Sequence, residues 1–154
     1  MSRNYFQLAY VTTDIDRAME EIARLHGIGG FMQMRDNAFP TGPERQAVCH
    51  FALAYKGDLQ FELIQPLAED VEIYRQALPT DGYGLVFHHL GRHFAARADF
   101  DAALAEARSK WPIPIGYDTL GGVYAYADAR ADLGHHLEFF CFPEGSHLDA
   151  VPRY

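Results

Sequence analysis

The sequence predicts an α+β fold in which two tandem βαβββ modules form a curved mixed β-sheet cup with helices on the outside. A short sequence motif typical of the start of a helix occurs twice, as Asp14–Glu21 and again as Asp99–Glu106. Each copy follows a strand-like run, and each is followed much later by a lone glutamate among apolar residues, Glu62 and Glu138. Because strand, helix motif and glutamate recur in the same order, internal duplication explains the pattern better than chance.

The elements of the first module follow from its residue types. The β-branched and aromatic run over 5–12 is typical of a strand. Thr13 or Asp14 then caps a helix with apolar residues at helical spacing, and Gly27 is the first of several glycines that end it. The remaining expected elements are a strand over 31–35, a loop over 36–45 rich in Pro, Gly and Asn, and a hairpin of strands over 47–55 and 59–65.

The second module repeats this order after a connector. We expect one compact domain with a first module over 1–67, a connector over 68–83 and a second module over 84–154. The connector should hold a short helix within 69–78 and a turn at 79–82. The second module should contain a strand over 85–94, a helix over 100–110 and strands over 113–117, 122–127 and 135–142.

Composition narrows the classes of function and location. The net charge of −8 argues against nucleic-acid and anionic-membrane partners, which require clustered Lys and Arg. Cys49 and Cys141 lie in strand-like apolar runs and form no disulfide framework, which fits a reducing compartment. The N-terminal segment has no apolar stretch suited to a signal peptide or a membrane span. The prediction is a cytoplasmic protein with a small-molecule partner.

One polar side chain on the first strand and one on the last strand of each module suggest a shared site. Gln7 and His89 occupy the first strands, and Glu62 and Glu138 the last. A carboxylate among apolar residues is costly to bury unless it is paired or bound to a cation. The alternative is that each glutamate faces water on the open side of an antiparallel sheet. We expect the four side chains to converge across a pseudo-twofold axis.

This ligand set favours a divalent metal ion. Three oxygens and one nitrogen, without a thiolate, suit one Zn, Ni, Co or Mn ion per chain, with room for substrate oxygens. Non-haem iron oxygenases usually require two histidines and one carboxylate. Gln7 occupies the place of the second histidine. Oxygen chemistry is therefore disfavoured.

Several short motifs in register carry a family resemblance. They are Phe61–Leu67 at the end of the first module, Gly82-x-Gly84 followed by His88–Gly91 at the start of the second, and Gly134 before the last strand. On these residues the chain resembles the vicinal oxygen chelate superfamily, which includes glyoxalase I, methylmalonyl-CoA epimerase, extradiol dioxygenases and the fosfomycin and bleomycin resistance proteins. The resemblance covers essentially the whole chain.

The resemblance also implies a ligand set. The family's metal ligands come from the first and last strands of each module, which places them on Gln7, Glu62, His89 and Glu138. A Gln, Glu, His, Glu set is similar to the zinc form of glyoxalase I.

The chain departs from its nearest family patterns at three places. The epimerases carry a further catalytic glutamate on the third strand of the first module, where Val48–Phe51 contains no acid. Glyoxalase I places an arginine and an asparagine four residues after its two first-module ligands, where this chain has Val11 and Pro66. Neither epimerase activity nor glutathione recognition follows from the resemblance.

The resemblance implies a metal-dependent isomerase, epimerase or lyase that acts on a small carbonyl, oxo-acid or thioester substrate through a metal-stabilised enolate. Glu138 is the first choice for the catalytic base, with Glu62 as its counterpart. The alternative is a metal-independent small-molecule binding protein of the resistance type, in which Tyr5, Tyr124 and Tyr126 stack on the ligand. A ring-cleaving dioxygenase is less favoured.

The remaining expectations concern the pocket and the assembly. The candidate substrate-pocket residues are His50, His93, Tyr124, Tyr126 and His136. We expect the segments 36–45 and 66–83 to supply pocket walls. Because neighbouring side chains of a strand face opposite sides, His88 should point away from His89. Since the family commonly forms homodimers, the resemblance implies a homodimer.

Overall fold

The computed structural model describes residues 5–119, 121–143 and 146–154. A single eight-stranded sheet runs through them in the order β2-β3-β4-β1-β5-β8-β7-β6. Its strands are β1 (Gln7–Thr12), β2 (Met32–Gly42), β3 (Arg45–Lys56), β4 (Leu59–Glu69), β5 (Leu85–His93), β6 (Ile115–Thr119), β7 (Gly122–Ala127) and β8 (His136–Cys141). The helices are α1 (Ile15–His26), α2 (Glu72–Arg75), α3 (Arg97–Arg108) and α4 (Arg130–Leu133), with a 3-10 turn over His147–Ala150.

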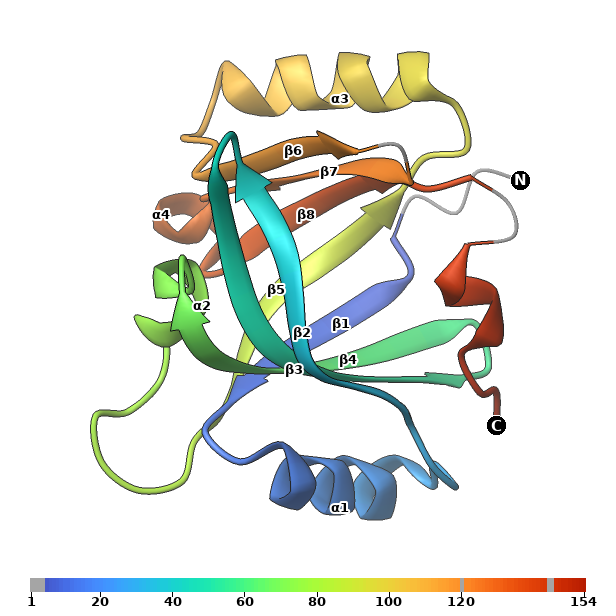
Figure 1. The fold of residues 1–154 in the computed structure, drawn as a ribbon. Coiled ribbons are helices and arrows are strands. Elements are labelled where there is room, and N and C mark those ends of the chain that lie inside the picture. The colour runs from blue at the N-terminus through green and yellow to red at the C-terminus, as the bar shows by residue number, and fades with distance from the viewer. Residues whose placement is uncertain (1–4, 120, 144–145) are drawn as a thin grey trace.

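The strand pairing has the same pattern on both sides of the centre. β1 and β5 pair antiparallel in the middle of the sheet. β1 pairs parallel with β4, and β5 pairs parallel with β8. The sheet curves into a cup with α1 and α3 on opposite outer sides (Figure 1). The predicted fold of two βαβββ modules that form a curved mixed sheet is confirmed.

Both long helices cover the sheet from outside. The Asp14 side chain accepts a hydrogen bond from the Arg17 amide at the start of α1, and Gly27 ends the helix in the left-handed conformation with φ of 64°. The residues of α1 that are buried share one face: Ile15, Ala18 and Ile22. They pack against β3 and β4, whereas α3 packs against β7 and β8.

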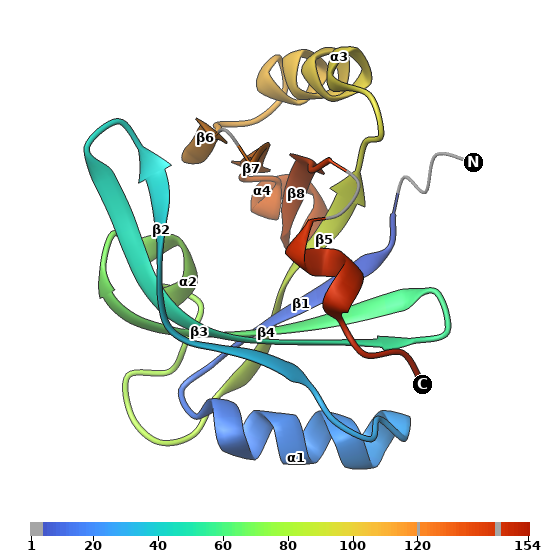
Figure 2. The same ribbon diagram turned by 45° about the vertical axis from the view of Figure 1, so that its right-hand side comes forward.

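The expectation of a loop over 36–45 is wrong, because β2 continues to Gly42 and the connection to β3 is a tight turn. β2 is an edge strand, where Pro40 is tolerated because its missing N–H removes no central ladder bond. A bulge between Met34 and Asn37 bends the hairpin. The hairpin therefore curls over the cup until β2 lies against β6 (Figure 2).

Two further features concern the described part of the chain. Cys49 and Cys141 are free thiols, and burial raises the pKa of the Cys49 thiol to about 12. None of the helices in the described residues has the length and apolar character needed to cross a membrane.

Candidate metal centre

Three of the four expected ligands converge at one buried point. The His89 Nε2 atom lies 3.3 Å from Glu62 Oε2 and 3.2 Å from Glu138 Oε2. One ligand atom from each residue lies within 4.8 Å of the other two. His89 is fully buried, and both carboxylates are nearly so. Although they face each other at ion-pair distance, His89 Nε2 and Glu62 Oε2 make no well-aligned hydrogen bond within the described ranges, and this arrangement of buried atoms fits a cation between them.

The fourth expected ligand, Gln7, lines the same cavity as Glu62 and Glu138. Its Nε2 donates to Gln60 Oε1 at 2.9 Å, which leaves the buried Gln7 Oε1 without a hydrogen-bond partner in the described part of the chain. Gly91 lies directly opposite on β5, and a Cβ there would come within 2.3 Å of Gln7 Oε1. The glycine is therefore needed for the amide to occupy its place.

His88 supports His89 directly, contrary to the expectation that it points away. The two Nδ1 atoms lie 2.8 Å apart, and His88 Nε2 lies 2.9 Å from the Ile73 carbonyl oxygen. The reason is a β-bulge: Ala9 pairs with His89 and Tyr10 with Phe87, so His88 is an extra residue that breaks the alternation of faces.

The hydrogen bonds of His88 determine the tautomer of His89. A carbonyl only accepts, so His88 carries its proton on Nε2 and presents a bare Nδ1. Burial lowers the pKa of His88 well below its usual value, which keeps the ring neutral. His89 must then donate from Nδ1, and its Nε2 faces the two carboxylates. This is the nitrogen that a metal ion would use.

The electrostatics of the centre point to a cation as well. Burial alone would lower the pKa of His89, but the carboxylates of Glu138 and Glu62 outweigh it and raise the pKa to about 9. Burial raises the pKa of Glu62, and the nearby Glu138 charge adds to this effect. In the absence of an ion, the His89 imidazolium supplies the positive charge between the two carboxylates. A divalent ion would supply it once His89 loses the Nε2 proton.

The donor set therefore fits a divalent ion with mostly oxygen ligands. His89 would supply a nitrogen, and Glu62 and Glu138 would supply carboxylate oxygens. Gln7 lines the same cavity, and its Oε1, which lacks a hydrogen-bond partner among the described residues, would supply an amide oxygen. Zn, Ni, Co and Mn all accept such ligands. Two carboxylates balance the charge of the ion.

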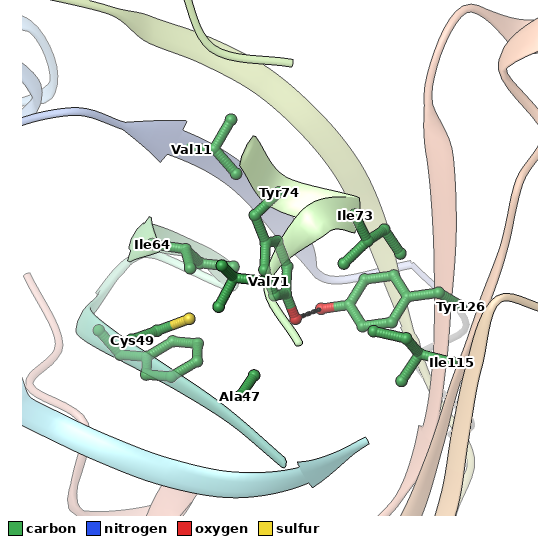
Figure 3. Close-up of a cluster of buried hydrophobic side chains, with 10 residues drawn as sticks. Val11, Ala47, Cys49, Ile64, Val71, Ile73, Tyr74, Ile115 and Tyr126 are labelled. Carbon is green, nitrogen blue, oxygen red and sulfur yellow. Dashed lines mark hydrogen bonds between the residues drawn. The ribbon is translucent and has the colours of Figure 1, made fainter. Parts of the chain in front are cut away.

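A cavity of about 410 Å³ opens beside this centre. The aromatic members of its lining are Phe39, Phe51, Tyr74, Tyr124, Tyr126, Phe140 and Phe142. The Tyr74 and Tyr126 hydroxyls share a hydrogen bond at 3.2 Å, and Figure 3 shows the two phenols meeting at their oxygen atoms, with ring planes 86° apart. Burial raises the pKa of both phenols well above the usual value, so they remain protonated. The Tyr124 hydroxyl donates to the Pro40 carbonyl and links β7 to the β2–β3 hairpin.

The candidate pocket residues lie in two different settings. Tyr124 and Tyr126 belong to the cavity lining, which does not include His50, His93, His136 or Tyr5. The excluded side chains have other partners: His50 accepts from the Asp36 amide, His93 packs on Phe6 and Phe140, His136 stacks on His88, and Tyr5 lies under Arg92.

Sequence reasoning did not single out several lining residues. Tyr74 comes from the segment 66–83, and Asn37, Phe39 and Pro40 come from 36–45. These are the two segments expected to form walls. The composition of the segments gave no indication of which residues turn inward.

The fold and the centre together define a class of protein: a two-module βαβββ cup with a candidate metal centre where the two halves meet. The family model described as Glyoxalase/Bleomycin resistance protein/Dioxygenase superfamily matches residues 6–126. The chain therefore belongs to this superfamily. No protein of curated function matches the chain in sequence.

Solved structures share the fold. A methylmalonyl-CoA epimerase in complex with methylmalonyl-CoA and NH4+ has a TM-score of 0.60 at 16% identity, with 92% of this chain and 96% of that chain covered. The methylmalonyl-CoA epimerase from Mycobacterium tuberculosis has a TM-score of 0.58 at 14% identity, with 97% and 93% covered. A Streptomyces coelicolor variant of the enzyme, in complex with 2-nitronate-propionyl-CoA, has a TM-score of 0.59 at 16% identity, with 92% and 99% covered. At these identities the likeness concerns the fold.

Proposed function

We propose that this protein is a metal-dependent isomerase, epimerase or lyase that acts on a small carbonyl compound by moving a proton next to the carbonyl group. The observation that carries the proposal is the buried set of Glu62, His89 and Glu138 ligand atoms within 4.8 Å of one another, beside a cavity of about 410 Å³. The fold likeness to methylmalonyl-CoA epimerases, which bind carbonyl compounds, supports the same class of chemistry.

The roles of the side chains follow from their positions. A divalent ion held here would polarise the substrate carbonyl and stabilise negative charge on its oxygen. Glu138 lines the cavity from β8 and is the base that removes the proton. Glu62 reaches the same cavity from β4, in the other half of the sheet, and is placed to return a proton.

Metal analysis and proton exchange test this proposal. Protein purified without added metal should contain about one divalent ion per chain, measured by elemental analysis. The loaded protein should then exchange deuterium from solvent into the carbon next to the carbonyl of a substrate, measured by proton NMR.

Glu138→Gln, loaded with metal to the same content, should lose this exchange by about 10²-fold or more, because the base is removed. Glu106→Gln, which changes an exposed glutamate of α3, is the matched control and should leave it unchanged. Retained exchange in Glu138→Gln would reject the assignment of the base.

A second candidate function is metal-independent binding of a small molecule. The seven rings of the cavity lining favour it, because a binding protein holds its ligand by stacking and burial. In that case a chelator that strips the metal would leave ligand affinity unchanged, and no carbonyl substrate would exchange protons. The metal-dependent proposal expects the chelator to abolish exchange.

A further inference from the structure

The charge of the cavity limits which substrates can enter it. Its described lining contains two acidic residues, Glu62 and Glu138, and no lysine, arginine or histidine. With a divalent ion in place, the two carboxylates and the ion sum to zero (−2 + 2 = 0). The cavity then offers no net positive charge to an anionic part of a substrate.

The lysine and arginine side chains on the strands and helix that line the cavity already have interaction partners outside it. Arg35 pairs with Asp16 at 2.5 Å, and Arg45 pairs with Asp70 at 3.3 Å. The other two donate to backbone carbonyls, Lys56 to Gly27 at 3.1 Å and Arg75 to Leu67 at 3.3 Å. Turning one of them inward would break an interaction already made. A carboxylate or phosphate held against the walls, away from the ion, would therefore lose its hydration without gaining an ionic partner.

The walls favour a flat apolar body instead. Phe39 and Phe51 meet edge to face with ring centroids 5.3 Å apart, and Tyr124 and Tyr126 do so at 6.3 Å. Such walls present ring faces and edges to a bound aromatic or apolar group. Tyr74 and Tyr126 share one hydrogen bond between their hydroxyls at 3.2 Å, which leaves one of the two hydroxyl protons available to a neutral substrate oxygen.

We infer that the part of the substrate held against the cavity walls, beyond the oxygens that face the centre, is uncharged and largely apolar or aromatic, and that substrates with a carboxylate in that part are rejected. This inference rests on the proposed function, since the neutral charge balance assumes a divalent ion at the centre. It narrows the proposed carbonyl substrates to those with a neutral body next to the carbonyl group.

A pair of probes that differ only in charge tests the inference. The probes are 4-(hydroxyacetyl)benzamide and 4-(hydroxyacetyl)benzoate, which share the ring and the adjacent oxygens but differ by one carboxylate far from them. Titration calorimetry on the zinc-loaded protein at pH 7 should give an affinity at least about tenfold higher for the amide. Equal or tighter binding of the benzoate would overturn the inference, and so would failure of both probes to bind.

A cation placed in the wall provides the matched test. Asn37 lines the cavity and is half-buried on β2. Asn37→Lys should raise the benzoate affinity about tenfold relative to the amide, whereas Asn37→Gln should keep the original preference. An unchanged preference in Asn37→Lys would contradict the charge argument.

The same titrations on metal-free protein separate this inference from the proposed function. Walls that favour neutral ligands should still prefer the amide when no ion is present, because the described lining contains no cation and the two carboxylates outweigh the single charge of the neighbouring His89 imidazolium. If the protein binds no metal or exchanges no protons but prefers the amide, the proposed function fails and the charge preference stands. If the protein exchanges protons but prefers the benzoate, the proposed function stands and the charge preference fails.

Discussion

The two halves of the molecule place their ligands in the same register but hold them by different means. Gln7 pairs with Gln60 across β1 and β4, as His89 pairs with His136 across β5 and β8. Gln60 binds Gln7 directly, whereas His136 stacks on His88, and His88 binds His89. The shared strand register therefore determines the position of each candidate ligand on its strand. The neighbouring side chains determine how that ligand is oriented.

The halves also differ in what they contribute to the cavity. β2 and β3 span 11 and 12 residues, whereas their counterparts β6 and β7 span 5 and 6. The longer hairpin curls over the cup and supplies lining residues such as Phe39 and Phe51. Both halves thus contribute candidate ligands, and the first half adds most of the wall.

The largest effect should come from removing the second-half nitrogen ligand. His89→Ala should lower zinc affinity by more than about a hundredfold, since it removes the nitrogen ligand itself, whereas loss of an outer partner of such a ligand costs about 10–100-fold. Gln7→Ala should cost only about tenfold, because a neutral amide oxygen is the weaker ligand. Competition with a fluorescent chelator measures both. Equal losses, or no loss in either variant, would contradict the assignment of unequal ligands in the two halves.

The side chains that bind the ligands, His88 and Gln60, should have the next largest effect on zinc affinity. His88→Ala should reduce zinc affinity about 10–100-fold, the usual range for an outer partner that fixes a histidine tautomer. Gln60→Ala should have a smaller effect, because it frees the Gln7 amide without changing a protonation state. His26→Ala, an exposed histidine of α1, is the control. A larger loss in Gln60→Ala than in His88→Ala would reverse the comparison.

The contact between the halves gives a third test. Gly91→Ala should destabilise the protein by about 1–3 kcal/mol and weaken metal binding, because the new Cβ would overlap Gln7. Gly116→Ala is the matched control, since its nearest neighbour would lie at an ordinary 3.5 Å. Chemical denaturation measures the stability of both variants. Equal stability of the two would show that the Gln7 side chain is not held over Gly91.

The next prediction concerns the pH dependence of metal binding. The carboxylates raise the pKa of His89 to about 9, so metal must displace a proton, and affinity should rise roughly tenfold per pH unit below that value. Calorimetry in buffers of different ionisation enthalpy should detect the released proton.

Without metal the sign of the pH effect is reversed. The stabilising contribution of protonated His89 is fully present below the unfolded pKa of about 6.5 and is lost as pH rises through about 9. Denaturation of metal-free protein at both ends of this range should show the loss, and His89→Gln should not. For the metal-binding experiment, a metal affinity that does not change between pH 6 and 8 would contradict the raised pKa of His89.

The sequence predicted the repeated modules and the proximity of Glu62, His89 and Glu138 to one another. This was possible because the order of elements along the chain and the period-two alternation within a strand can be read from the sequence itself. It did not predict that β2 would continue through Pro40, since only the position of β2 at the sheet edge makes that proline acceptable. It also misplaced His88, because a bulge depends on the partner strand. The module boundaries at 1–67, 68–83 and 84–154, the homodimer and the cytoplasmic location stay predictions.

X-ray absorption spectroscopy on the zinc-loaded protein tests the metal centre most directly. We expect one imidazole nitrogen with oxygen ligands at about 2.0–2.2 Å and no sulfur near 2.3 Å. His89→Ala should remove the imidazole signal. A sulfur ligand, more than one imidazole, or a chain that retains no ion would contradict a centre built from Gln7, Glu62, His89 and Glu138.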